Sequence, residues 1–393
     1  MDLIRKNEKI FVYLILSAII LLGFYLCFIG GYGSDEDTLP MIYVFEAKLD
    51  GGRFVTSRYT GNPLAELGIG FLSHFFGSFA ANLFTYIFLL LGLIIFYFAF
   101  SKDKSLEKLN FFIFLCLTSP ILFFDNLEPV DYSWAFFFFS CGVFFLSKKL
   151  FELSIMFFAF SIGVRINYVL FVIITILFFQ FEEKISLFRR LTIFFSSFIF
   201  GGLFYLPIWF DNSFGLSWLT AGRPTDQGYI GLLSRFLYKL YISIGYISSF
   251  ILLIFLFKEF NRINKIKNIK VLLLLCLSNL LIFLWIPAEF SYLQLFLVVL
   301  CLIIFNLNNK KFIYLMCLGN LLSWFIFISP IKIQYVDNEY CAPKNAISAS
   351  FEIKMEKGFY FKYLESRDKI KCWVHGTSER DIKILKGQAL RLD

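Results

Sequence analysis

The chain has 393 residues, of which 59% are hydrophobic and only 17% are charged, and its net charge is +8. This composition excludes a soluble globular protein, because such a fold cannot bury so much apolar surface. A nucleic-acid partner is not expected either. The lysines and arginines lie in short stretches between apolar runs, where they set the orientation of a membrane protein.

Long apolar runs divide the chain into about eleven candidate transmembrane helices, since a segment in lipid must satisfy its own backbone hydrogen bonds. We therefore predict an all-α polytopic membrane protein. The first run, residues 10–30, follows basic residues and lacks a clear cleavage site after it, which indicates an uncleaved span rather than a signal peptide. The other spans are expected at 79–100, 110–124, 133–147, 150–163, 166–180, 191–210, 236–257, 271–286, 291–306 and 312–329.

Basic and acidic residues alternate between successive connections. Basic residues gather near 102–108, 148–149, 184–190, 258–270 and 310–311. The positive-inside rule places these stretches and the N-terminus in the cytoplasm, for a protein of the inner (plasma) membrane. Acidic residues gather in 31–62, 125–131, 211–235 and 287–290. An odd number of spans then places the C-terminus outside.

We expect two parts in this chain. Residues 1–329 would form the transmembrane domain, with a first outer loop at 31–78, and residues 330–393 would form a small extracytoplasmic domain. The tail is polar, and apolar and polar residues alternate at 350–355 and 359–363, which predicts strands. The tail is therefore expected to be an extramembrane α+β or β-containing segment.

The cysteines and histidines indicate no metal centre. Most cysteines lie in apolar runs, where they behave as small hydrophobic side chains. His74 and His375 are far apart and lack companions at ligand spacing. Cys341 and Cys372 lie in the tail; outside the cell they would meet an oxidising compartment, and both a disulfide and free thiols stay open.

The first outer loop is richest in residues that carry chemistry. Asp35, Glu36 and Asp37 follow the first span almost directly. Like charges held together at a membrane surface repel one another, which favours protonation of at least one of them. Such a cluster suits a general base, or alternatively a divalent-cation site. A solvated loop that only marks the outer face explains the same acidity without chemistry.

Farther along the loop, the chain reads Ser57-Arg58-Tyr59-Thr60-Gly61-Asn62-Pro63. An acidic pair after the first span, followed by an Arg-x-x-Gly-x-Pro segment, resembles the GT-C superfamily of membrane glycosyltransferases. The closest resemblance is to its protein-mannosyltransferase and aminoarabinose-transferase-like branch, with Asp35 and Glu36 at the place of the acidic pair. The chain departs from the pattern at Asn62, where the aminoarabinose-transferase branch often has a lysine that contacts the donor phosphate.

Three later segments resemble the same family. The second outer loop supplies Asp125, Glu128 and Asp131. The turn Gly163-Val164-Arg165-Ile166-Asn167 resembles an arginine-containing turn midway along these chains. The segment from Pro287 through Glu289 to Tyr292 resembles a late Pro-x-Glu-x-x-Tyr-Leu element.

The resemblance implies transfer of a sugar from a polyprenyl-phosphate donor to a glycan, lipid or protein acceptor on the non-cytoplasmic face, usually with inversion. It implies no defined cofactor. A carboxylate must accept the proton of the acceptor hydroxyl, for which Asp35 is expected and Asp37 is the alternative. The leaving phosphate needs a fixed cation, from Arg58, Arg165 or Arg223. Residues expected to contact or orient the substrates are Glu36, Asp125, Glu128, Asp131, Glu289 and Tyr292.

Other readings stay open. Arg58 is also explained by pairing with a nearby carboxylate, and Glu289 by solvation at a membrane boundary. A polysaccharide polymerase or ligase acting on lipid-linked glycans would use outer-loop arginines, but usually carries a large late outer loop. A transporter or flippase would favour charges deep within spans and repeated halves, and neither pattern is evident in the sequence.

Overall fold

A computed structural model gives the fold of the chain and describes residues 2–32, 38–49, 57, 61–101, 105–181, 185–211, 228–286, 290–335 and 346–366. Helices account for most of these residues, and the described part holds a single two-stranded sheet. The helices of the first half are α1 (Asp2–Ile29), α2 (Thr38–Leu49), α3 (Pro63–Phe100), α4 (Leu106–Thr118), α5 (Pro120–Phe124), the 3-10 turn η1 (Asp125–Leu127), α6 (Asp131–Ser147), α7 (Phe151–Val164) and α8 (Tyr168–Phe178).

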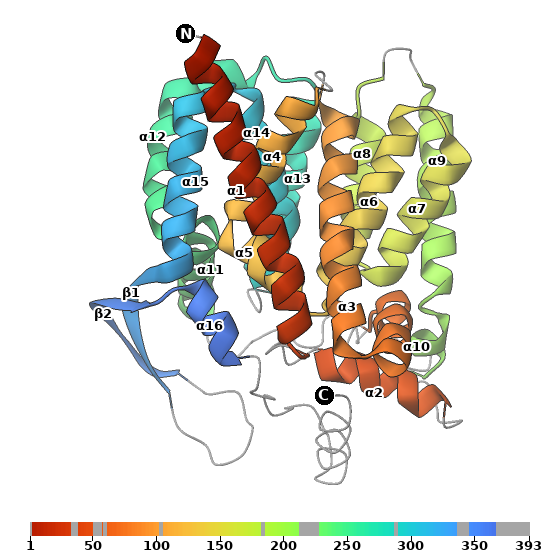
Figure 1. Ribbon diagram of the computed structural model, residues 1–393. Helices are drawn as coiled ribbons and strands as arrows, with labels where there is room; N and C mark the ends of the chain where they lie inside the picture. The colour runs from red at the N-terminus through yellow and green to blue at the C-terminus, as the bar shows by residue number, and fades with distance from the viewer. Residues whose placement is uncertain are drawn as a thin grey trace.

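The second half continues the bundle and ends in a hairpin (Figure 1). Its elements are α9 (Leu187–Leu203), α10 (Leu206–Asp211), α11 (Gly228–Ile244), α12 (Tyr246–Ile263), α13 (Ile269–Trp285), η3 (Phe290–Leu293), α14 (Gln294–Asn306), α15 (Lys310–Phe325), β1 (Ile326–Tyr335), β2 (Ala346–Lys357) and α16 (Phe359–Ser366).

The apolar helices identify a helical membrane protein. Lys9–Ile29 and Pro63–Phe100 are long and apolar enough to cross a membrane, and the number rises to at most four if two bent helix pairs are each counted as one span. Large apolar side chains face outward, with Phe28 69% exposed and Phe257 85% exposed. Such a surface requires an apolar surrounding. The helical membrane class is confirmed, whereas the expected number of about eleven spans stays a prediction.

Several expected spans are interrupted. The span expected at 110–124 bends by 92° between α4 and α5, where Pro120 has no backbone N–H to continue the helix. The span expected at 236–257 bends by 89° between α11 and α12, at Gly245 with φ 91°. The helix expected to run to residue 329 ends at Phe325. The span expected at 191–210 is divided into α9 and α10.

The expected first outer loop, 31–78, is largely helical in its described part. It contains α2 and the first residues of α3. The α3 helix is broken at Gly77, whose φ of 75° and ψ of −176° are not helical. The helix breaks here because only glycine adopts this backbone conformation readily. The break lies two residues before position 79, where the span was expected to begin.

Close helix packing forms the core between α3, α6 and α7. Phe88 of α3 stacks on Phe137 of α6 at 4.5 Å between ring centroids. Gly142 of α6 lies so near α7 that a Cβ there would be 2.4 Å from the ring of Phe158. The hydroxyl of Ser154 donates to the Gly142 carbonyl oxygen at 2.9 Å. The absence of a side chain at Gly142 therefore allows α6 and α7 to pack closely.

The C-terminal segment returns to the bundle. The strands pair antiparallel from Ile326 with Lys357 to Tyr335 with Ala346. Residues 350–355 lie in β2, as expected, but the strand expected at 359–363 is wrong, because these residues form α16. Helical spacing brings Phe359 and Tyr363 to the same ring, that of Phe124, at 6.5 and 5.9 Å between ring centroids. The extramembrane location of this segment stays a prediction.

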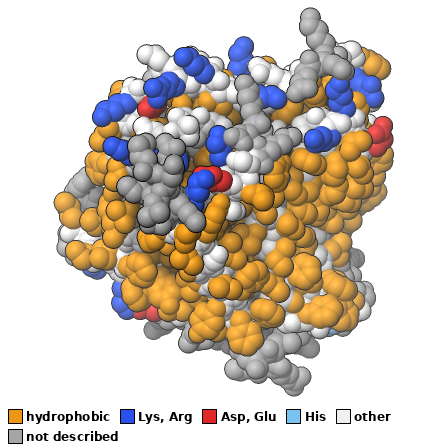
Figure 2. All heavy atoms as spheres, turned by 45° about the horizontal axis from the view of Figure 1, so that its top comes forward, with side chains coloured by type: hydrophobic (Ala, Val, Ile, Leu, Met, Phe, Trp, Pro, Cys, Tyr) orange, Lys and Arg blue, Asp and Glu red, His pale blue; other side chains and the backbone are white. Residues whose placement is uncertain are grey.

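The two ends of the bundle differ in charge. Figure 2 shows lysine and arginine side chains gathered at the end that carries the N-terminus. Lys9 of α1 pairs there with Glu107 of α4 at 2.6 Å. The opposite end carries α2, α10, α16 and the hairpin (Figure 1). Connections expected to be cytoplasmic therefore share one end of the described structure, as the alternation of charge predicts.

Candidate functional site

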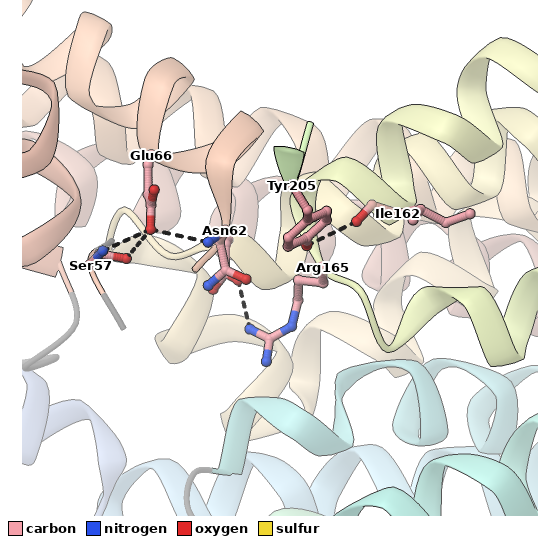
Figure 3. A network of polar contacts seen from close by, with 7 residues as sticks. Ser57, Asn62, Glu66, Ile162, Arg165 and Tyr205 are labelled. Atoms are coloured by element: carbon pink, nitrogen blue, oxygen red, sulfur yellow. Dashed lines mark hydrogen bonds and ion pairs between the residues drawn. The ribbon is translucent and has the colours of Figure 1, made fainter. Parts of the chain in front are cut away.

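Four connections meet at the end of the bundle opposite the basic residues. They are the first turn of α3, the segment from η1 into α6, the turn between α7 and α8, and η3. Three of them carry residues that the sequence marks as candidates. Figure 3 shows the part of this site around Glu66, Arg165 and Tyr205.

The centre of the site is a buried ion pair. Asp131, the first residue of α6, accepts a hydrogen bond from Nη1 of Arg165 at 2.7 Å. Arg165 follows the last turn of α7, and its side chain is 6% exposed, while that of Asp131 is fully buried. Because an isolated charge is very costly in such surroundings, each residue supplies the counter-charge that the other needs.

Two tyrosine rings cover the guanidinium. The Arg165 guanidinium carbon lies 3.8 Å from the ring centroid of Tyr132 and 4.7 Å from that of Tyr292. The two rings meet edge to face at 5.5 Å. Aromatic faces attract a cation and shield it from water. The arginine turn, the acidic second loop and the late tyrosine segment are thus brought together, although 160 residues separate the two rings.

A chain of polar contacts fastens the second loop to η3 and α14. Ser291 donates to the Asp125 carboxylate at 2.8 Å. Gln294 donates to the Ser133 hydroxyl at 3.2 Å, and that hydroxyl donates to the side chain of Asn126. No sequence pattern distinguishes Ser291, Gln294 or Asn126 from other polar residues at span ends.

Glu128 lies in the same loop and is 8% exposed. Burial, helped by the Glu128 carboxylate and then by Cys27, raises the pKa of Tyr363 well above its ordinary value. The Tyr363 hydroxyl therefore stays protonated and donates to the Leu26 carbonyl oxygen at 3.2 Å. This bond connects α16 to the end of α1, just before the first outer loop.

Glu66 binds two residues near the end of the first loop, although it is not among the site residues that the sequence predicts. Its Oε1 atom accepts hydrogen bonds from the backbone N–H of Ser57 at 2.9 Å and of Asn62 at 3.0 Å, and from the Ser57 hydroxyl. The Glu66 N–H donates back to the Asn62 carbonyl oxygen at 2.9 Å. The Glu66 carboxylate thus satisfies the backbone N–H of Asn62 at the start of α3, and Asn-Pro followed by a glutamate in the first turn is a helix-start signal visible in the sequence.

The second carboxylate oxygen of Glu66 is buried and has no hydrogen-bond partner among the described residues. Figure 3 shows Tyr205, which lies between α9 and α10, beside Arg165. Its hydroxyl donates to the Ile162 carbonyl oxygen at 3.1 Å. Tyr205 thereby ties α9–α10 to the last turn of α7, directly before Arg165.

The remaining candidates lie outside the described residues. These are Asp35, Glu36, Asp37, Arg58, Arg223 and Glu289. Several are next in sequence to residues of the site. Arg58 follows Ser57, which Glu66 holds, and Glu289 precedes Phe290, the first residue of η3.

Within the described ranges, no group of three or more His, Cys, Asp or Glu side chains is arranged to hold a metal ion. Comparison with protein families, with curated proteins and with solved structures finds no match for this chain.

Proposed function

We propose that the protein is a membrane glycosyltransferase that moves a sugar from a polyprenyl-phosphate donor to an acceptor on the non-cytoplasmic face, as part of cell-envelope glycan synthesis. One observation carries the proposal. Asp131, Arg165 and Tyr292, from segments far apart in sequence, meet at the end of the bundle opposite the basic residues. The acidic first loop begins where α1 ends at that same side.

In this proposal Asp35 is the general base, with Asp37 as the alternative. The base accepts the proton of the acceptor hydroxyl as its oxygen attacks the anomeric carbon, and the bond from that carbon to the donor phosphate breaks. A positioned base contributes about 10²–10⁴-fold to such a reaction. Asp35 is six residues beyond Ile29, the last residue of α1, and this short separation in sequence suits a base that must meet a lipid-linked substrate at the bilayer surface.

Cations would stabilise the departing phosphate. Arg58 is placed in sequence between two residues held by Glu66, so its segment is anchored at both ends. Arg165 is the second candidate, because a guanidinium recognises phosphate oxygens well. Asp131 and the rings of Tyr132 and Tyr292 fix its direction, which lets it act without reorganisation during the reaction.

The distribution of buried charge favours a transferase over a transporter or flippase. Among the described residues, the buried charged side chains are Glu66, Glu128, Asp131, Arg165 and Glu259. Each lies in the first or last turns of a helix or between helices, rather than halfway along one. Transport of a charged substrate calls for ionisable groups near the bilayer midplane.

The test is transfer of labelled sugar from polyprenyl-phosphate donors by membranes that contain the full chain. We expect the wild-type protein to transfer sugar and Asp35→Asn to lose at least a hundredfold in rate, since the amide cannot accept the proton. Glu152→Gln is the matched control, because Glu152 is exposed at the other end of the bundle, and it is expected to retain full activity.

Each outcome is informative. Full activity in Asp35→Asn, together with loss in Asp37→Asn, would move the base by two residues and keep the transferase. Activity in both variants would contradict a base in this loop. Long glycan products made only from lipid-linked oligosaccharides would favour the polymerase, and inactivity with every donor would contradict the proposal.

A further inference from the structure

The β1–β2 hairpin presents an apolar face that the function proposed above does not use. In the ladder Met355 lies opposite Ile328, and Ile353 is two residues from Met355, a spacing that places both β2 side chains on one face of the strand. Ile353 is 81% exposed and Met355 is 72% exposed. Large apolar side chains that lie together at a surface mark a place where a protein or a membrane is contacted.

The other face of the hairpin is turned toward the bundle. Phe327 of β1 is buried, and its ring lies 6.3 Å from that of Tyr246 in α12 and 6.0 Å from that of Phe359 in α16, measured between centroids. Successive side chains of a strand point to opposite faces. With Phe327 on the inner face, its neighbour Ile326 belongs to the outer face, together with Met355.

The outer face continues an apolar stripe of α15. The exposed large apolar side chains of this helix are Leu315, Leu318, Leu322 and Phe325, and their spacing of three and four residues places them on one side. Ile326 follows directly and is itself exposed, and the ring of Phe361 in α16, also exposed, lies 6.3 Å from that of Phe325. The lipid-facing side of the bundle thus extends without a break onto the C-terminal segment.

The length of α15 requires such an extension. The helix has 16 residues, which span about 24 Å at ~1.5 Å per residue, whereas the hydrocarbon core of a bilayer is about 30 Å thick. Lys310 and Lys311 begin the helix at the basic end, so the missing length falls at Phe325. Apolar residues of the hairpin are therefore placed at the depth where the hydrocarbon core gives way to the headgroups.

The hairpin also projects in a direction that suits this depth. Figure 1 shows β1 and β2 reaching sideways from the foot of α15, instead of continuing along the axes of the helices. A bilayer that surrounds the bundle is roughly perpendicular to those axes. Lipid beside α15 therefore extends over the hairpin.

The charged side chains near this face are paired within the segment. Lys357, opposite Ile326 in the ladder, pairs with Glu365 of α16, and Lys362 pairs with Glu356 at 3.0 Å. A paired charge costs less at a membrane surface than a single one. Lysines beside apolar side chains also suit the headgroup region, because the long stem stays in apolar surroundings while the ammonium group reaches water.

We propose that the outer face of the hairpin lies on the bilayer surface, with Ile353 and Met355 inserted at the boundary between headgroups and acyl chains. The strands themselves stay at headgroup level, since an open sheet edge cannot satisfy its backbone groups in hydrocarbon. The C-terminal segment would then be an interfacial element and not a domain in free solution. This contact does not depend on the proposed reaction.

The experiment uses the full chain in phosphatidylcholine nanodiscs. In a background with Cys341→Ser and Cys372→Ser, one cysteine is introduced by Ile353→Cys, Met355→Cys or Lys354→Cys and carries an environment-sensitive fluorophore. The six remaining cysteines are buried. Lys354 is the matched control, because it is exposed and lies between the other two positions on the opposite face. Quenching by a lipid with a nitroxide near its headgroup is compared with quenching by aqueous iodide, and the melting temperature of each variant verifies folding.

We expect the lipid nitroxide to quench the fluorophore at positions 353 and 355 about threefold more than at 354, since the two faces of a strand point in opposite directions. Iodide should show the reverse order. Iodide quenching at 353 and 355 without lipid quenching would place the face in water and overturn the proposal. Protection from both quenchers would identify a protein cover, either residues 367–393 or a second copy, and would overturn it too, as would equal lipid quenching at all three positions.

Discussion

Arg165 illustrates how a single charged residue is made tolerable in an apolar bundle. One carboxylate neutralises it, and two tyrosine rings, themselves in contact, cover the guanidinium. The attraction between buried opposite charges roughly offsets the cost of removing them from water. The same pair would be expensive to break, because the remaining partner would be a buried charge without compensation.

Removing one partner of this pair should destabilise the protein strongly. We expect Arg165→Gln or Asp131→Asn to lower the free energy of unfolding by about 3–5 kcal/mol. The double variant should cost less than the two single changes added together, by about 1–3 kcal/mol, because no charge is left alone. Thermal unfolding of the purified variants in detergent measures these differences.

Arg262→Gln is the control for this experiment. Its partner Glu259 is 3.0 Å away, but the Arg262 side chain is 65% exposed, so we expect a change within about 1 kcal/mol. Strictly additive losses in the double variant would show that Asp131 and Arg165 do not depend on each other.

At the scale of elements, small residues decide how closely the helices pack. Gly142 lets α6 approach Phe158 of α7, whose side chain is fully buried and cannot move aside easily. Gly202 of α9, by contrast, has no atom within 4 Å of where a Cβ would stand. Both glycines lie in helices but differ in the space around them. Substituting each by alanine therefore distinguishes the effect of packing from the effect of helix propensity.

Gly142→Ala and Gly202→Ala should therefore have opposite effects. We expect Gly142→Ala to lower the free energy of unfolding by about 1–3 kcal/mol through overpacking. Gly202→Ala should leave it unchanged or raise it by up to about 1 kcal/mol, because alanine favours the helix. Melting temperatures of both variants give the comparison. Equal stability would mean that α6 and α7 do not pack as closely as described.

At the scale of the whole molecule, the charge difference between the two ends bears on orientation. Lys148 is exposed at the basic end, and Glu365 of α16 is exposed at the other end. The positive-inside rule assigns the first to the cytoplasm. If the number of spans is odd, the second lies outside, on the side of the proposed active site.

Cysteine labelling tests this arrangement. In a background with Cys341→Ser and Cys372→Ser, we introduce either Lys148→Cys or Glu365→Cys. The six remaining cysteines are buried and should not react. A membrane-impermeant maleimide applied to intact spheroplasts should label the Glu365→Cys protein alone, and inverted vesicles should reverse the pattern. Labelling of both variants from one side would contradict the predicted topology.

Sequence patterns predicted the helical membrane class and the separation of basic from acidic connections. Both depend on local composition, since each apolar run must form its own hydrogen bonds in lipid and each loop lies at one surface. The pattern was less informative where a helix bends. Gly245 and Pro120 are visible in the sequence, but such residues do not by themselves reveal that the chain turns by about a right angle there. The 359–363 segment was misjudged because aromatic residues suit either period, and its contacts with Phe124 decide between them.

For the candidate site, the resemblance to a glycosyltransferase family and the acidic residues at span ends named Asp125, Asp131, Arg165 and Tyr292 as candidates, and their contact with a substrate stays a prediction. Only the tertiary structure paired Asp131 with Arg165, placed the two tyrosine rings over the guanidinium and showed Glu66 holding the first loop. Hydropathy and motif spacing are local properties of the chain. The packing of helices decides which distant residues neutralise one another. A buried charge needs an opposite charge close by, and only the arrangement of neighbouring helices determines which residue supplies it.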